Sequence, residues 1–161
     1  MAKIEQKAPI IEEIKSNLDG FQGVVLADYR GINVSDDTKM RKELREAGVV
    51  YKVYKNTYIK LAIKGTELEA LNDMLEGPTA LAVSKTDSTA PARIIAKYAK
   101  TVEPLSLKCG YIDGAFYDKA AIEQIASLPG REELIGRLLG SIKSPVSNFA
   151  RVLNQIAEKT A

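Results

Sequence analysis

The stretch "GVVLADYRG", residues 23–31, decides the fold of this chain. Val24 to Ala27 form a continuous apolar run that is short enough for a strand buried on both faces. The run ends in a turn, where Gly31 can supply a backbone of positive φ. Two readings of Tyr29 and Arg30 are open: a solvated loop, or side chains at the carboxyl end of a strand, where a guanidinium fork can take a phosphate.

Helical and strand patterns alternate on both sides of this strand. The pattern predicts three further strands, over 49–54, 79–84 and 105–112. It predicts helices from Pro9 to Leu18, from the N-cap Ser35 to Ala47, from a cap at Asn56 or Thr57 to near Lys64, over 67–75 (a short one), from Pro91 onward and over 118–128. This order indicates an α+β fold in residues 1–128. We expect a ferredoxin-like (split βαβ) antiparallel sheet covered by helices.

Residues 129–161 carry no strand pattern and form a helical C-terminal extension. We expect one helix over 131–141 and, because Pro145 resets the chain direction, a second helix after it. The second helix has an apolar stripe of Val146, Phe149, Leu153 and Ile156. Two readings are open: the stripe packs on the core of the chain itself, or it binds helices of another protein.

Composition excludes most enzyme chemistry. The chain has 161 residues, one cysteine and no histidine, so it has no internal disulfide, no Cys-x-x-Cys pair and no histidine general base. Its glycines fit neither a P-loop nor a dinucleotide fingerprint. We therefore expect no catalytic residue, no metal site and no cofactor. The absence of long apolar stretches and of an apolar signal core predicts a cytoplasmic protein with no membrane partner.

Basic residues concentrate around the stretch "YKVYKNTYIK", residues 51–60. Residues 38–64 contain eight basic side chains and only two acidic ones, Glu43 and Glu46. We therefore expect that no acid in this part of the chain neutralises the basic side chains. The junction of strand and helix adds free N–H groups that suit an anion. A solvated face is the plainer reading, but the clustering favours a phosphate-contact surface for folded RNA. It would comprise Arg41, Lys42, Arg45, Lys52, Lys55, Asn56, Thr57 and Lys60, with Lys3 and Lys7 on an arm at the amino end.

Six motifs make the chain resemble a known family over nearly its whole length. They are "DYRG" (28–31), "LREAGV" (44–49), "YKVYKNT" (51–57), "GPTA" (77–80), "AP" (90–91) and "LPGREEL" (128–134). In this order they are similar to the bacterial large-subunit ribosomal protein ten family, the ribosomal stalk-base proteins.

The resemblance implies a structural ribosomal protein rather than an enzyme. It implies an amino-terminal α+β domain on large-subunit ribosomal RNA beside the neighbouring eleventh large-subunit protein, and a C-terminal helix that binds dimers of the acidic stalk protein, through which translation GTPases are recruited. By position, Tyr29, Arg30, Gly31, Lys55, Asn56 and Thr57 would lie at or near the RNA, and Val146, Phe149, Leu153 and Ile156 on the stalk-binding helix. The alternative is a ferredoxin-like small-molecule-sensing domain that homodimerises through its tail.

Overall fold

The structure of the protein is a computed structural model that describes residues 8–102 and 105–160. The chain divides into two compact units, Met1–Leu128 and Pro129–Ala161, called here the head and the tail. No helix in the described part of the chain is both long enough and apolar enough to cross a membrane. Lys3 and Lys7, predicted to contact RNA, lie outside the described residues.

The head contains one antiparallel sheet of five strands. The strands are β1 (Gly23–Asp28), β2 (Val49–Val53), β3 (Ala80–Ser84), β4 (Ser106–Ile112) and β5 (Ala115–Asp118), and their order across the sheet is β2-β3-β1-β4-β5. β3 separates β1 from β2, and β1 separates β3 from β4. Each βαβ unit is therefore split by a strand of the other, which confirms the predicted α+β, ferredoxin-like architecture.

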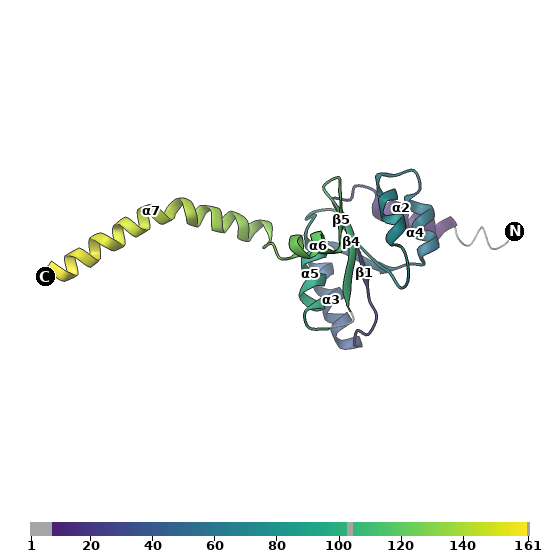
Figure 1. The fold of residues 1–161 in the computed structure, drawn as a ribbon, viewed down its shortest axis with the longest axis horizontal. Coiled ribbons are helices and arrows are strands. Elements are labelled where there is room, and N and C mark those ends of the chain that lie inside the picture. Colours follow the sequence, from purple (N-terminus) through teal and green to yellow (C-terminus); the bar gives the residue numbers. More distant parts are fainter. Residues whose placement is uncertain (1–7, 103–104, 161) are drawn as a thin grey trace. The chain divides into compact units, whose positions relative to one another are not determined.

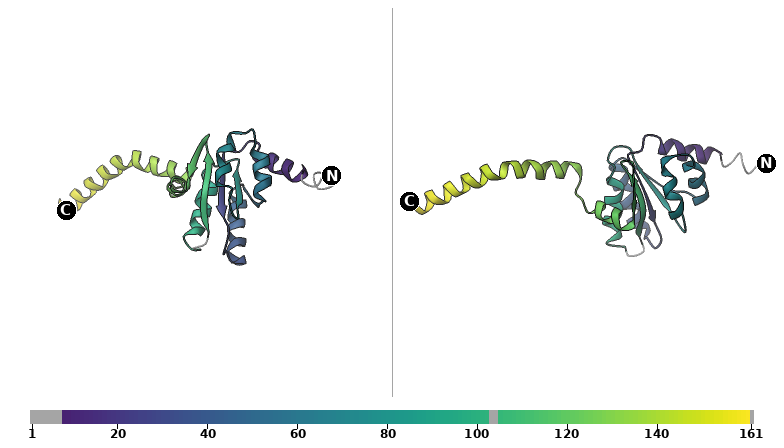
Figure 2. Two further views of the ribbon diagram at one scale, coloured as in Figure 1. Left: turned by 45° about the vertical axis from the view of Figure 1, so that its right-hand side comes forward. Right: turned by 45° about the horizontal axis from the view of Figure 1, so that its top comes forward.

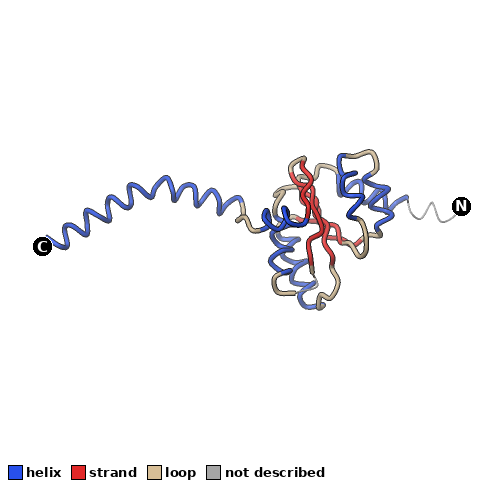
Figure 3. Tube along the Cα trace, in the orientation of Figure 1, coloured by secondary structure: helices blue, strands red, loops and turns tan. Residues whose placement is uncertain are grey.

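Helices cover both faces of the sheet (Figures 1 and 3). One face carries α3 (Val34–Glu46), α5 (Ala90–Ala99) and α6 (Lys119–Ala126), and the other carries α2 (Ala8–Leu18), α4 (Asn56–Ile63) and the 3-10 helix η1 (Glu67–Met74). Turning the molecule shows the same three layers, with the sheet in the middle (Figure 2). The segment between β2 and β3 thus supplies α4 and η1, which share one face of the sheet with α2.

Two hydrophobic cores result, one on each side of the sheet. Alternate residues of β1 point into opposite cores, so that Val25 packs with α3 and α5 while Val24 and Leu26 pack with α2 and α4. Every residue of β1 is buried. This explains why its sequence reads as a continuous apolar run, and the predicted strand buried on both faces is confirmed.

Helix starts differ from the prediction at two places. α3 begins at Val34 after Asn33, not after Ser35, and α4 begins after Lys55. Neither Asn33 nor Lys55 makes a side-chain cap hydrogen bond. The predicted caps were wrong because a strong capping residue one or two positions away does not fix where the chain turns. In addition, the helix predicted over 67–75 is the tighter 3-10 form.

The strand β5 was not predicted. Ile112 pairs with Ala115, so Asp113 and Gly114 form a two-residue hairpin loop, and both have positive φ, 49° and 83°. An Asp-Gly pair between two short strand patterns is a strong hairpin signal. That signal was present in the sequence.

The tail is a single helix, α7 (Arg131–Thr160), with Pro145 inside it. The prediction of two separate helices was wrong. A proline removes one backbone donor and crowds the carbonyl four residues earlier, but the turns on either side keep their own hydrogen bonds. The helix therefore continues with a bend about halfway along, visible in Figure 1.

Candidate nucleic-acid and protein interfaces

Two predicted RNA-contact segments follow strands that end at the same edge of the sheet. β1 and β2 both run antiparallel to β3, and their residues Ala27 and Val53 both pair with Ala80. The turn 29–31 therefore follows the same end of the sheet as the junction 55–57. These two segments, 29–31 and 55–57, are at least 24 residues apart in sequence (31 to 55) and are together defined here as the strand-end surface.

The turn of the strand-end surface is built around an ion pair. Arg30 donates to Asp28 through Nε and Nη2, the latter at 2.8 Å from Oδ2. The hydrogen bond from Arg30 holds the pKa of the Asp28 carboxyl below its ordinary value. Gly31 has a φ of 72°, as predicted. Asp28 occupies one edge of the guanidinium, and Nη1 of Arg30 has no hydrogen-bond partner among the described residues.

The junction of β2 and α4 holds the loop before β3 in place and adds a positive charge to the strand-end surface. The Asn56 side-chain amide donates to the carbonyl of Gly77 at 2.7 Å, and Lys108 Nζ donates to the carbonyl of Pro78 at the same distance. Asn56 therefore anchors the loop before β3. Lys55 and Thr57 are exposed at the first turn of α4, where backbone N–H groups are free of helical partners.

Acids neutralise more of the predicted cations than the sequence indicated. Arg41 pairs with Asp37 at 2.7 Å, Lys42 lies 3.9 Å from Glu46, and Lys52 pairs with Glu13 of α2. The hydrogen bond from Lys52 lowers the pKa of Glu13 and raises that of Lys52. The expectation of an unneutralised patch was therefore wrong for these three, and also for Lys39, which lies 3.7 Å from Asp36. Glu13 lies 39 residues from Lys52 in the chain, so local charge counting could not find it.

The remaining cations have no ion-pair partner among the described residues. They are Arg45, Lys55, Lys60 and Lys64, all of them exposed. Arg45 belongs to α3, whereas Lys60 and Lys64 belong to the α4 segment on the other face of the sheet. The predicted residues thus do not form one flat patch. They are distributed over both helix layers beside the edge strand β2.

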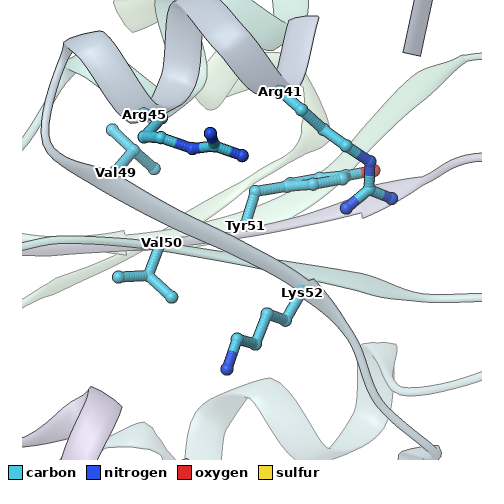
Figure 4. A pocket seen from close by; sticks show the side chains of 6 residues that line it. All are labelled: Arg41, Arg45, Val49, Val50, Tyr51 and Lys52. Carbon is cyan, nitrogen blue, oxygen red and sulfur yellow. The ribbon is translucent and has the colours of Figure 1, made fainter. Parts of the chain in front are cut away.

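A pocket of about 270 Å³ lies along β2 (Figure 4). It is lined by Arg41, Arg45, Val49, Val50, Tyr51 and Lys52. The Arg41 guanidinium carbon lies 4.8 Å from the centroid of the Tyr51 ring. Lys52 leaves the strand on the side opposite Tyr51 (Figure 4), because successive side chains of a strand point to opposite faces. Sequence reasoning identified the cations but not the pocket, which requires the packing of α3 on β2.

The tail presents a continuous apolar stripe to solvent. Seven residues follow one another at alternating spacings of four and three: Ile135, Leu139, Ile142, Val146, Phe149, Leu153 and Ile156. Phe149 is 65% exposed and Val146 72% exposed. Such spacing is the heptad pattern of helices that pack against other helices. The prediction covered only the four residues after Pro145, because the break expected there concealed the continuity.

The described residues contain no cluster of three or more histidine, cysteine, aspartate or glutamate side chains that could hold a metal ion. Burial raises the pKa of the single thiol, Cys109, to about 12. This thiol is therefore a core group in a neutral form.

Comparison with known proteins identifies the family. The family model of ribosomal protein L10 matches residues 2–100, and that of the ribosomal protein uL10 C-terminal region matches residues 128–161. The large ribosomal subunit protein uL10 of Clostridioides difficile is 45% identical over 157 residues, covering 97% of this chain and 94% of that relative. The uL10 proteins of Clostridium acetobutylicum and Bacillus licheniformis are 46% and 42% identical over 155 and 156 residues, covering 96% and 97% of this chain and 90% and 94% of those relatives. The chain therefore belongs to the ribosomal protein L10 (uL10) family and is, as expected, a structural protein of the large ribosomal subunit rather than an enzyme.

Proposed function

We propose that the head binds large-subunit ribosomal RNA through the strand-end surface and the cations beside β2. Lys55 and Lys60 are exposed cations with no acidic partner among the described residues, and the turn 29–31 adds Arg30 at the same end of the sheet as Lys55. Side chains of this kind bind phosphates without reading bases. The spread of cations over two helix layers suits the curved backbone of folded RNA.

We further propose that α7 binds helices of acidic stalk-protein dimers. The observation that carries this proposal is the stripe of seven apolar side chains, exposed along a helix of 30 residues. An exposed apolar stripe of this length is costly in water and is stabilised when another helix covers it. The head and tail would then serve as the RNA-binding domain and the stalk-binding helix respectively, beside the eleventh large-subunit protein, with translation GTPases recruited through the stalk. The alternative of a small-molecule sensor is not retained, because the chain belongs to a ribosomal family.

The RNA contact is tested by salt-dependent binding. The double variant Lys55→Ala/Lys60→Ala should bind an in vitro transcript of bacterial large-subunit ribosomal RNA more weakly. Its log–log salt slope should be shallower by roughly 1.4 to 1.8, because each phosphate contact contributes about 0.7 to 0.9. The matched control is Lys100→Ala/Lys119→Ala, which removes two cations near α5 and α6. An equal change in both variants would show that only net charge matters.

The helix contact is tested with a pair of variants on α7. Phe149→Asp places a charge in the apolar stripe and should weaken association with the purified acidic stalk protein by more than about tenfold. Ser147→Asp adds the same charge on the opposite face of the helix and serves as its control. Self-association of the wild-type chain at micromolar concentration, without binding of the stalk protein, would favour a homodimeric tail instead.

A further inference from the structure

The pocket along β2 contains a buried hydroxyl without a partner. Tyr51 is only 8% exposed, and its hydroxyl oxygen has no hydrogen-bond partner among the described residues. Burying a hydroxyl without a partner costs free energy. Nothing in the packing of the free head explains why tyrosine rather than phenylalanine stands here.

Two guanidinium groups with unused donors line the same pocket as the Tyr51 ring. Arg41 donates to Asp37 through Nε alone, so its Nη1 and Nη2 have no partner among the described residues. Arg45, one helical turn later, has no side-chain partner in the described part of the chain. Figure 4 shows Arg45 extending along the pocket toward Tyr51, with the Arg41 guanidinium beside the hydroxyl end of the ring.

The protonation state of Tyr51 suits an anionic ligand. Burial, and next the nearby Asp37 charge, raise its pKa to about 12. At neutral pH the hydroxyl therefore carries its proton and can donate it. A phosphate oxygen accepts such a bond, whereas a cationic or purely apolar ligand leaves the three donor groups unpaired.

We propose that this pocket binds one RNA phosphate, held by the Nη donors of Arg41 and the guanidinium of Arg45 and completed by the hydroxyl of Tyr51. The proposal rests on the proposed RNA-binding function of the head and adds a specific site to it. Because the hydroxyl is covered in the free protein, the phosphate draws the Arg41 guanidinium outward from the ring. Asp37 holds Nε during this movement and keeps the fork at the pocket. The apolar side chain of Val49, on the same side of β2 as Tyr51, limits the water that competes for the phosphate.

Removing the hydroxyl of Tyr51 tests whether this group contacts a ligand or stabilises the fold. Tyr51→Phe removes no hydrogen bond within the described head, so the urea midpoint should stay equal or rise. The affinity for the large-subunit RNA transcript should nevertheless fall roughly three- to tenfold, because a bond to a charged acceptor is lost. Tyr117→Phe is the matched control. Tyr117 lies in β5 at the opposite edge of the sheet, has no hydrogen bond through its hydroxyl among the described residues, and its replacement should leave RNA affinity unchanged.

Replacing Arg45 by lysine tests whether the pocket needs the two-pronged guanidinium group or only a positive charge. Arg45→Lys keeps the charge, so the salt slope should stay near that of the wild type while the affinity falls about threefold or more. Equal affinities of wild type, Tyr51→Phe and Arg45→Lys would overturn the phosphate site, while a loss in Lys55→Ala/Lys60→Ala in the same experiment would leave the proposed function intact. Failure of the wild-type chain to bind the transcript would overturn both. Equal losses in Tyr51→Phe and Tyr117→Phe would likewise exclude a site at the pocket.

Discussion

Asp28 shows how a single side chain connects the sheet to the strand-end surface. It is only 7% exposed at the end of β1, and Arg30 folds back on it from the turn. The hydrogen bond from Arg30 lowers the pKa of Asp28 below its ordinary value of 3.8, although burial opposes the shift. A carboxyl whose pKa is depressed in the folded state stabilises the fold above the unfolded-state pKa, and this contribution is lost as the pH falls through the folded-state pKa.

The lowered pKa of Asp28 can be tested by measuring stability at acidic pH. The wild-type head should lose stability more steeply than Asp28→Asn as the pH falls below about 4, because only the wild type takes up a proton at this position. Glu13 and Glu43 also have lowered pKa values, but they titrate in both proteins and cancel in the difference. Urea unfolding midpoints between pH 2.5 and 6 provide the measurement, and parallel curves for the two proteins would contradict the assignment.

Gly23 is a second position where a single added atom should change the stability of the head. A Cβ built on Gly23 would lie 2.2 Å from the backbone carbonyl oxygen of Ser88, so the chain on one side would have to move. Gly23→Ala should therefore destabilise the head by about 2 kcal/mol or more, as overpacking at a rigid neighbour does. Gly136→Ala is the control, since a Cβ there meets nothing within 4 Å. Equal unfolding midpoints for Gly23→Ala and the wild type would show that Ser88 moves freely.

At the scale of elements, Pro145 in α7 has the largest effect on a helix. It removes one backbone hydrogen bond from the middle of a helix of 30 residues. Pro145→Ala should raise the helix content of the tail, because alanine is better than proline in a helix interior by about 3 kcal/mol. Far-UV circular dichroism of the full-length chain measures this change. An unchanged helix signal would mean that the bend at this point does not depend on proline.

Most elements of the head could be predicted from local patterns. The apolar run 24–27, the stripe Met40 and Leu44 of α3, and the position of Pro9 near the start of α2 each identify one element from spacing alone. The start of α4 was wrong because it depends on how the chain leaves β2. The short β5 was missed although its signal, the Asp113-Gly114 pair, is local in the sequence.

The candidate site shows the same division. The sequence could predict that Arg41, Arg45 and Lys52 are basic and near one another in the chain. It could not predict that Glu13 on α2 neutralises Lys52, or that Tyr51 is buried beside Arg41 with its hydroxyl unpaired. These properties arise because α2 and α3 lie on opposite faces of the sheet, so that Glu13 reaches Lys52 from one face while Arg41 covers Tyr51 on the other. Residue types therefore indicated the ligand class, whereas packing indicates which cations are available to it.

At the scale of the whole molecule, the proposed RNA-binding and helix-binding surfaces belong to different compact units. As a protein of the large ribosomal subunit, the chain works at the ribosome in the cytoplasm, as predicted. The head has its own two hydrophobic cores, and no tail residue belongs to either. The tail, in contrast, has no buried apolar residue among those described. On the proposed function, its helix would gain its packing from the stalk protein, whereas the head has cores of its own.

This division predicts the behaviour of a truncated chain. A fragment of residues 1–128 should unfold cooperatively, with a urea midpoint close to that of the full-length chain, because both cores are retained. It should bind the large-subunit RNA transcript within about threefold of the full-length affinity, since the proposed contacts lie in the head. It should also lose association with the acidic stalk protein completely. Mass measurement of native complexes, with RNA and stalk protein added separately and together, reports all three. A fragment that aggregates, or that loses its RNA affinity with the tail, would show that α7 packs on the head and that the apolar stripe is a core face rather than a site for a partner.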